Sequence, residues 1–246
     1  MAILPVVGAL ALLARYRLGS RRDTLTGTAV LGALALVYTT PWDNYLIQRG
    51  VWWYGDGAVF ARIWAAPLGE YLFFLLQPLL VALWAVRFPI ETDHSLSIPP
   101  AERALGLLAA GVVAVAGVWL LGADSGLYLG SLLAWSAPIL AIQWAFGWPV
   151  LVAEWRAVLG GTLAPTLYLW VVDRIAIGVG LWSLSDRYTT GLAVPLLGLP
   201  IEEAVFFLLT SLFVVQGLVL YVWLVERVRG TRQPEPAPES ARSRGL

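Results

Sequence analysis

Long apolar runs dominate the pattern of hydrophobic and polar positions along this chain, and short polar segments separate them. A run of about 18 apolar residues is long enough to cross the hydrocarbon core of a bilayer as a helix. The pattern therefore predicts an all-α, polytopic membrane protein with about seven transmembrane helices. These lie near residues 2–16, 26–44, 66–87, 102–122, 127–148, 158–177 and 200–225.

The two ends of the chain differ in character. The first apolar run lacks a basic n-region and a small-residue cleavage site, so we expect a membrane span and not a removed signal. Residues 227–246 are rich in Pro and Arg, which predicts a disordered tail. Most arginines fall on the side of the membrane that holds this tail, and the positive-inside rule then predicts a cell-membrane protein with N-out and C-in orientation.

Two phrases of the sequence repeat each other. Residues 67–76 read PLGEYLFFLL and residues 198–209 read GLPIEEAVFFLL, which align at an offset of 133. Asp43 and Asp173 are separated by 130, a similar offset. Each unit has a span that ends in Asp, an aromatic loop and a span that opens with Glu, so we expect two parallel three-helix repeats joined by a linking helix. The predicted divisions are 1–100, 101–125, 126–226 and the tail 227–246.

Five carboxylic acids fall at one predicted depth, toward the same ends of four helices. They are Asp43, Glu70, Asp173, Glu202 and Glu203. Ionisable groups inside a membrane cost roughly 2.5–3.5 kcal/mol each at its centre, and the usual reason for keeping them is function. All five are candidate catalytic residues.

A purely structural explanation competes for some of these acids. Glu202 has Gly69 as its repeat counterpart and could cap the free amides of its own helix. Glu70 and Glu203 are matched in register, and each is followed by a Phe-Phe pair. A carboxyl group packed on aromatic rings loses hydration and can hold a proton at neutral pH, which favours function for these two. Asp43 and Asp173 could instead pair with nearby arginines at the interface.

The composition excludes several classes of chemistry. The chain has no cysteine, a single histidine and sixteen basic residues that are all arginine. Without lysine, a retinal or pyridoxal Schiff base cannot form, so a rhodopsin is excluded. One histidine cannot build a histidine-rich di-iron or haem centre. We therefore expect no metal and no cofactor, and the balanced charge gives no sign of a nucleic-acid partner.

Tryptophan is unusually frequent, with 13 residues, and most should lie in the interfacial belts. Trp42, Trp52, Trp53 and Trp182 gather beside the carboxylates in the two aromatic loops. If buried, their π faces could stabilise a cationic intermediate.

The stretches PWDN, WWYG, PLGEYLFFLL, VVDRIAIGVGLWSL and GLPIEEAVFFLLTSLF resemble the non-flavin, integral-membrane lycopene cyclases. The resemblance covers residues 1–226 and is to the fused, two-repeat form of that family. It implies carotenoid biosynthesis, in which the linear ψ ends of lycopene become β rings without net redox change. One departure is Gly69, where a second Glu would complete the repeated motif.

The resemblance implies roles for the candidate residues. Glu203 and Glu70 would donate or accept protons, Asp173 and Asp43 would tune or relay them, and Glu202 would support them. The substrate would contact a further set of mainly aromatic side chains. These are Asn44, Arg174, Trp52, Trp53, Trp182, Phe73, Phe74, Phe206 and Phe207. The implied partners are lycopene, the lipid bilayer and other carotenoid enzymes.

Three other functions stay open from the residues alone. Parallel repeats with intramembrane carboxylates also suit a proton-coupled transporter, although acids at one depth do not form a relay across the bilayer. An intramembrane prenyltransferase would need Asp-rich clusters to hold Mg²⁺, and no Asp-x-x-x-Asp pair occurs. A carotenoid-binding protein without catalysis would differ only in lacking activity.

Overall fold

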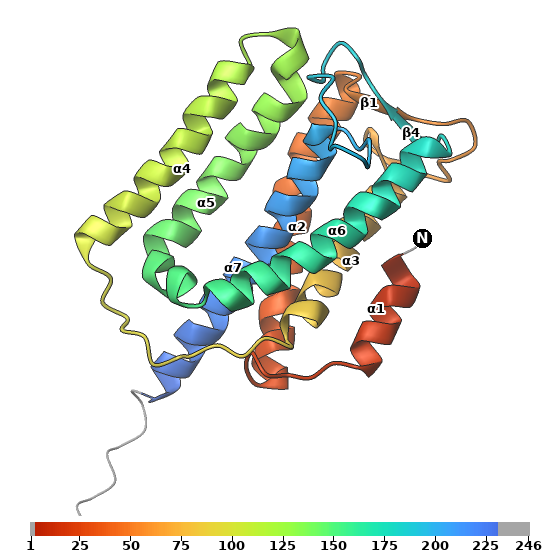
Figure 1. Cartoon of the computed structure of the whole chain (residues 1–246). Coiled ribbons are helices and arrows are strands. Elements are labelled where there is room, and N and C mark those ends of the chain that lie inside the picture. The colour runs from red at the N-terminus through yellow and green to blue at the C-terminus, as the bar shows by residue number, and fades with distance from the viewer. Residues whose placement is uncertain (1–2, 231–246) are drawn as a thin grey trace, which may run out of the picture.

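The computed structural model describes residues 3–230, so most of the expected tail lies outside the described residues. Figure 1 shows a bundle of helices with short strands at one end. The helices are α1 (Ile3–Leu12), α2 (Arg21–Gln48), α3 (Leu68–Ala85), α4 (Pro100–Leu120), α5 (Leu127–Ala153), α6 (Trp155–Gly178) and α7 (Ile201–Gly230). The strands are β1 (Trp52–Tyr54), β2 (Arg62–Ile63), β3 (Ala66–Pro67) and β4 (Trp182–Leu184).

The all-α, multi-pass class is confirmed. Five of the helices, α2, α3, α4, α5 and α7, are long and apolar enough to cross a membrane. At 1.5 Å per residue, α6 is about 36 Å long, which is enough to cross the hydrocarbon core by length alone, whereas α1 is about 15 Å long, which is enough for about half of it. The sequence predicts a longer first span, and it ends the last one near residue 225, whereas α7 continues to Gly230.

The last helix, α7, lies at the centre of the bundle. It contacts α2, α3, α5 and α6, and its residues from Ala204 to Trp223 contribute much of the buried apolar core. Helix α4 packs against α5, with no comparable contact to another helix among the described residues. The close approach of α4 to α5 depends on Gly117, where an added Cβ would lie 2.6 Å from the backbone nitrogen of Ala134.

Strands β1 and β4 join the two loops that follow α2 and α6. They are antiparallel, and Trp53 pairs with Ser183 at the centre of the register. Trp52 pairs with Leu184, and Tyr54 pairs with Trp182. At an offset of 130, Ser183 is the counterpart of Trp53, so equivalent positions of the two loops face each other. This is the register that a local two-fold axis between the loops produces.

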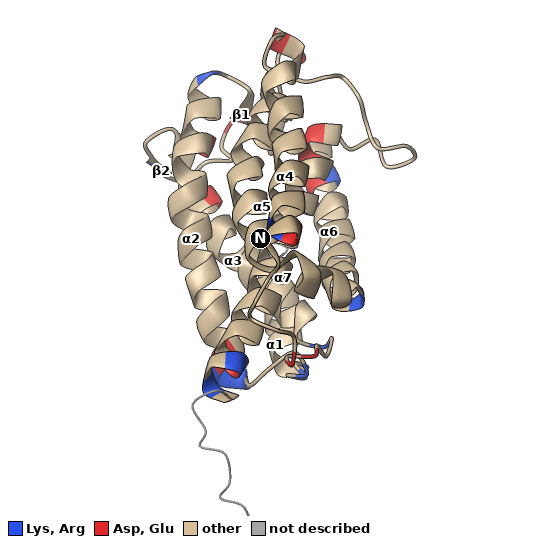
Figure 2. Cartoon of the chain, turned by 90° about the vertical axis from the view of Figure 1, so that its left-hand side faces the viewer, with Lys and Arg blue, Asp and Glu red and all other residues tan. Residues whose placement is uncertain are grey.

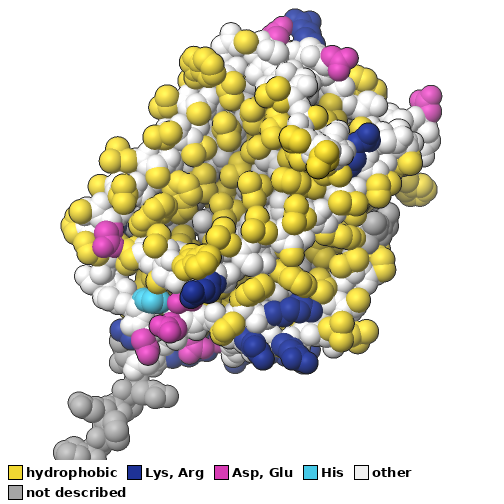
Figure 3. Space-filling model, in the orientation of Figure 1, with side chains coloured by type: hydrophobic (Ala, Val, Ile, Leu, Met, Phe, Trp, Pro, Cys, Tyr) yellow, Lys and Arg dark blue, Asp and Glu magenta, His cyan; other side chains and the backbone are white. Residues whose placement is uncertain are grey.

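Charged residues concentrate toward the ends of the bundle. Figure 2 shows arginines gathered at the lower end, where α2 begins, and Figure 3 shows hydrophobic side chains covering the middle of one face. At the lower end Arg229 donates to both carboxylate oxygens of Asp23, at 2.5 and 2.7 Å. This two-point ion pair ties the end of α7 to the start of α2.

Candidate functional site

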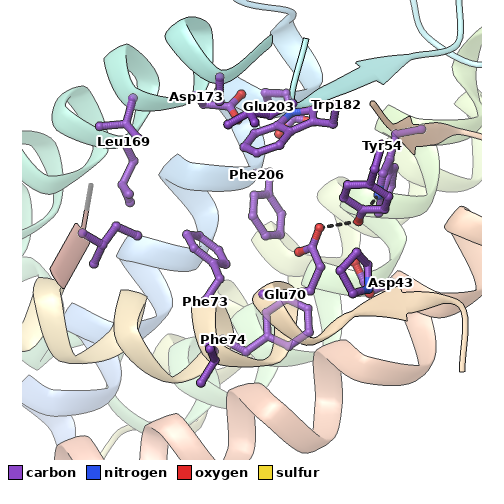
Figure 4. Close-up of a pocket in the computed structure, with 18 of the residues that line it drawn as sticks. Asp43, Tyr54, Glu70, Phe73, Phe74, Leu169, Asp173, Trp182, Glu203 and Phe206 are labelled. Carbon is purple, nitrogen blue, oxygen red and sulfur yellow. Dashed lines mark hydrogen bonds between the residues drawn. The ribbon is translucent and has the colours of Figure 1, made fainter. Parts of the chain in front are cut away.

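One cavity of about 540 Å³ lies beneath the β1–β4 pair, and four carboxylic acids line it. Asp43 comes from α2, Glu70 from α3, Asp173 from α6 and Glu203 from α7. Figure 4 shows Asp173 and Glu203 on one side of this cavity and Asp43 and Glu70 on the other. The structure therefore brings together four of the five acids that the sequence singles out.

The four acids occupy matched positions on their helices. Asp43 lies five residues before the end of α2, and Asp173 lies five residues before the end of α6. Glu70 is the third residue of α3, and Glu203 is the third residue of α7. These four helix ends meet beneath the strands. The two acids from the first half of the chain therefore lie at the same depth as the two from the second half.

Glu70 is held by a short chain of hydrogen bonds from the first loop. The hydroxyl of Tyr54 donates to Oε1 of Glu70 at 2.5 Å, and the indole Nε1 of Trp52 donates to the Tyr54 oxygen at 3.0 Å. Burial raises the pKa of the Tyr54 phenol, and the nearby charge of Glu70 raises it further. The phenol therefore keeps its proton and acts as a donor.

Glu203 also has a tyrosine partner, which comes from helix α5 and not from a loop. The hydroxyl of Tyr128, the second residue of α5, donates to Oε1 of Glu203 at 3.0 Å. Tyr128 is almost fully buried, and its ring lies 5.3 Å from that of Trp52. Each glutamate in the cavity thus has one phenol partner.

The two aspartates lack such partners. Both side-chain oxygens of Asp173 are buried without a hydrogen bond among the described residues, and so is Oδ2 of Asp43. The ion pairs of the described residues are His94–Glu154, Arg187–Asp124 and Arg229–Asp23, and none of them involves a cavity acid. An isolated carboxylate is costly in such surroundings, so the four acids cannot all be ionised together.

Aromatic rings form much of the cavity wall. Trp42 stacks on Phe206 with ring centroids 6.1 Å apart and an angle of 9° between the planes. Phe73 lies 6.4 Å from Phe206 and 6.0 Å from Phe207. These rings present electron-rich faces next to the carboxyl groups, which is a suitable environment for a transient carbocation.

The cavity also reaches the lipid-facing surface of the bundle. Its lining includes Ile175 of α6 and Val179 just after that helix, which are 60% and 68% exposed, and Leu72 of α3. These exposed side chains are apolar, so an apolar molecule can reach the acids from the membrane without crossing a polar layer.

Glu202 lies outside the cavity, although it precedes Glu203. Its side chain is fully buried, and its Oε1 accepts hydrogen bonds from the backbone amide of Thr190 at 2.7 Å and from the Thr190 hydroxyl at 2.8 Å. It anchors the loop between β4 and α7, and among the described residues it accepts no hydrogen bond from the free amides of its own helix. The capping alternative is therefore replaced by a contact between distant segments.

Three expected substrate-binding residues also lie outside the cavity. Oδ1 of Asn44 accepts from the amides of Ala65 and Ala66 at 2.8 and 3.0 Å, which fixes the start of α3. Nε of Arg174 donates to the carbonyl of Leu197 at 3.2 Å, and Trp53 is 52% exposed. By contrast, the structure places the remaining expected side chains in the lining, namely Trp52, Trp182, Phe73, Phe74, Phe206 and Phe207.

The structure also places Trp42 in the lining, one of the four tryptophans that the sequence gathers beside the carboxylates. Sequence reasoning missed the two tyrosines that donate to the cavity glutamates. Tyr54 follows the Trp52–Trp53 pair directly, so its place in that aromatic loop was a usable signal. Tyr128 belongs to no repeated motif, and only the packing of α5 against α7 reveals it.

A separate group of possible metal ligands lies away from this cavity. Glu91, His94 and Glu154 offer ligand atoms within 4.8 Å of one another, and His94 Nε2 lies 2.9 Å from Oε1 of Glu154. That contact joins the loop before α4 to the α5–α6 junction, which gives the group a structural role.

Comparisons with known proteins identify relatives of this chain. The chain is 46% identical over 229 residues to the lycopene beta-cyclase of Halobacterium salinarum, which covers 93% of this chain and 96% of that protein. It is 34% identical over 215 residues to the bifunctional lycopene cyclase/phytoene synthase of Gibberella fujikuroi, covering 85% of this chain and 37% of that protein. No protein-family model matches the chain, and no solved structure matches it significantly. Identity at this level over nearly the whole length shows that the chain belongs to the lycopene beta-cyclase family.

Proposed function

We propose that the chain converts the linear ψ ends of lycopene to β rings, first giving γ-carotene and then β-carotene. The reaction is an intramolecular isomerisation in carotenoid biosynthesis. The observation that carries the proposal is the cavity itself, where four carboxyl groups without counter-ions meet a wall of aromatic rings. The names of the relatives support the same activity.

Each ring closure requires that the substrate takes up one proton and releases another. A carboxylic acid adds a proton to C2 of the terminal C1=C2 double bond, which leaves a cation at C1. The C5=C6 bond attacks this cation, the C1–C6 bond forms, and the charge moves to C5. A carboxylate then removes the proton from C6, and the C5=C6 double bond is restored. A buried acid and a nearby base suffice for these steps.

The four cavity acids are the residues that would carry these protons. Glu70 and Glu203 lie against the phenylalanine pairs, while Asp43 and Asp173 lie one helix away. A neutral carboxyl group is the form that a site without cations favours, and it is the form that can protonate an alkene. The aromatic faces of Trp42, Phe206 and Phe73 would lower the energy of the cation.

A single cavity would serve both ends of the substrate. Both acid pairs line the same space, whose volume of about 540 Å³ is in the range of pockets that hold a drug-sized ligand. It would hold one end of a C40 chain while the rest extends between α3 and α6 into the lipid. The two ends would therefore react in turn.

The chain would consist of two parallel repeats about an axis along the bilayer normal. Helices α2 and α6 end 130 residues apart, and α3 and α7 begin 133 residues apart. The equivalent residues Phe73 and Phe206 contact each other, which supports an axis that passes between them. Helix α4 would link the repeats, and the arginine-rich end of the bundle would face the cytoplasm with the C-terminus.

Expression in a lycopene-accumulating bacterium tests the function directly. Pigments are extracted, separated by chromatography and identified by absorption and mass. The expected products are γ-carotene and β-carotene, and cyclisation of unlabelled lycopene by isolated membranes in D₂O should add one deuterium for each ring formed. Unchanged lycopene in cells whose membranes contain the inserted protein would disprove the proposal.

A further inference from the structure

The hydrogen bonds around Tyr54 have a fixed direction. The indole Nε1 of Trp52 can only donate, so the Tyr54 oxygen accepts from it at 3.0 Å. The hydroxyl has one proton, and it points to Oε1 of Glu70 at 2.5 Å. Glu70 is therefore the acceptor at the end of this chain of bonds. Figure 4 draws the Tyr54–Glu70 bond as a dashed line.

The hydrogen bond to Glu203 is longer than the one to Glu70, and its donor tyrosine has no indole partner in the described part of the chain. Tyr128 donates to Glu203 at 3.0 Å. The Tyr54–Glu70 bond is the shorter of the two, and only this bond has an indole donor behind its phenol. A phenol that is itself held by a donor keeps the accepting carboxyl group in one place.

The surroundings of the two glutamates also differ. Both side-chain oxygens of Asp173, beside Glu203, are buried without a hydrogen bond in the described part of the chain, whereas Oδ2 alone is in that state in Asp43, beside Glu70. Tyr54 keeps its proton because burial raises the pKa of its phenol, so it stays a donor to Glu70. The Glu70 side therefore has the more extended set of donors, which suits a carboxyl group that has to accept a proton.

We propose that Tyr54 is a positioning residue that fixes Glu70 as the base for the C6 proton, and that it thereby determines the ring type. The inference rests on the proposed cyclisation and assigns the first proton transfer to the Glu203–Asp173 side. Tyr54 acts through Glu70 and does not itself exchange a proton with the substrate.

The ring type follows from where the last proton leaves. The cation at C5 can lose a proton from C6, from C4 or from the methyl carbon on C5. These losses place the double bond at C5=C6 in a β ring, at C4=C5 in an ε ring, or outside the ring in a γ ring. All three products are isomers, so a base that is held less firmly changes the product without changing the mass.

The test is the product spectrum of Tyr54→Phe in the full-length protein, with lycopene as substrate. We expect β-ring formation to fall about tenfold, and ε or γ rings to appear. These rings remove one double bond from the conjugated system, so their absorption moves to shorter wavelength. The Tyr128→Phe variant should lower the rate but still form only β rings. Tyr45→Phe, the same change at a half-exposed site outside the cavity, should match the wild type.

A second variant covers the case in which Tyr54→Phe fails to insert. Trp52→Phe removes the donor to the Tyr54 oxygen but leaves the hydroxyl, and it should shift the products in the same direction by a smaller amount. If each of these two variants that inserts into the membrane forms only β rings, whatever its reaction rate, the inference is overturned. A wild-type protein that forms no rings would overturn the proposed function as well, so the two failures are distinguishable.

Discussion

Thr190 binds Glu202 through two hydrogen bonds, one from its backbone amide at 2.7 Å and one from its hydroxyl at 2.8 Å. Glu202 and Glu203 are neighbours in sequence, yet only Glu203 faces the cavity. The difference arises because adjacent residues on a helix point in directions about 100° apart. One glutamate therefore anchors a loop while the other lines the candidate site.

We expect Glu202→Gln to lower thermal stability more than it lowers activity. The substitution exchanges the carboxyl group that accepts two hydrogen bonds for an amide, and each hydrogen bond is worth about 0.5–1.5 kcal/mol. The midpoint of thermal unfolding in detergent should fall by several degrees, and Thr190→Val should lower it by less. Ring formation per folded molecule should stay near the wild-type value. A complete loss of activity with unchanged unfolding would contradict this role.

Glu203→Gln should have the opposite effect. The amide has nearly the same shape and can still accept from Tyr128, but it cannot transfer a proton. Ring formation should fall by about 100-fold or more, while insertion and the unfolding midpoint stay close to those of the wild type. Chromatography of pigments from membranes with matched protein content checks this. Wild-type amounts of β-carotene would remove Glu203 from the catalytic set.

Glu70→Gln distinguishes one shared cavity from two independent sites. If both substrate ends use the same cavity, the first and second cyclisations should slow together. Lycopene should then accumulate, and the ratio of γ-carotene to β-carotene at equal conversion should stay near the wild-type ratio. Accumulation of γ-carotene as the main product would instead indicate two sites with unequal roles.

Phe206→Leu tests the aromatic wall. Loss of the ring should slow cyclisation about tenfold, because the cation loses a π face that is worth about 1–2 kcal/mol. Phe213→Leu is the matched control, since Phe213 is a buried ring of the same helix outside the cavity. Both variants should lose similar stability, and only Phe206→Leu should slow the reaction. Equal rates in the two variants would rule out a role for the ring.

Much of the fold could be predicted because hydrophobic length determines where a membrane helix starts and stops. All seven helices of the described residues coincide with predicted spans, and their ends differ from the predicted ones by at most five residues. The clustering of Asp43, Glu70, Asp173 and Glu203 was also predictable, since repeated motifs on helices of known direction must meet at one depth. Their roles in proton transfer stay predictions until variants are measured.

Other features depend on contacts between residues far apart in the chain, and such contacts cannot be predicted from a single sequence. Tyr128 reaches Glu203 across 75 positions, and Glu202 finds Thr190 only after the loop has folded back. Asn44 reads as a polar neighbour of Asp43, but its carbonyl oxygen binds the segment before α3. Polar residues of this kind resemble site residues in composition and differ from them only in geometry.

The pairing of Trp53 with Ser183 has a consequence for how such a protein can be encoded. The contacts between the two halves run through α2, α3, α6, α7 and the β1–β4 pair, and α4 contributes little to them. A gene divided near α4 would therefore yield two polypeptides that each retain one strand of the pair. These polypeptides would assemble side by side in the bilayer as separate subunits. A covalent link through α4 keeps the two halves close together, but it does not change the helices and strands through which they contact each other.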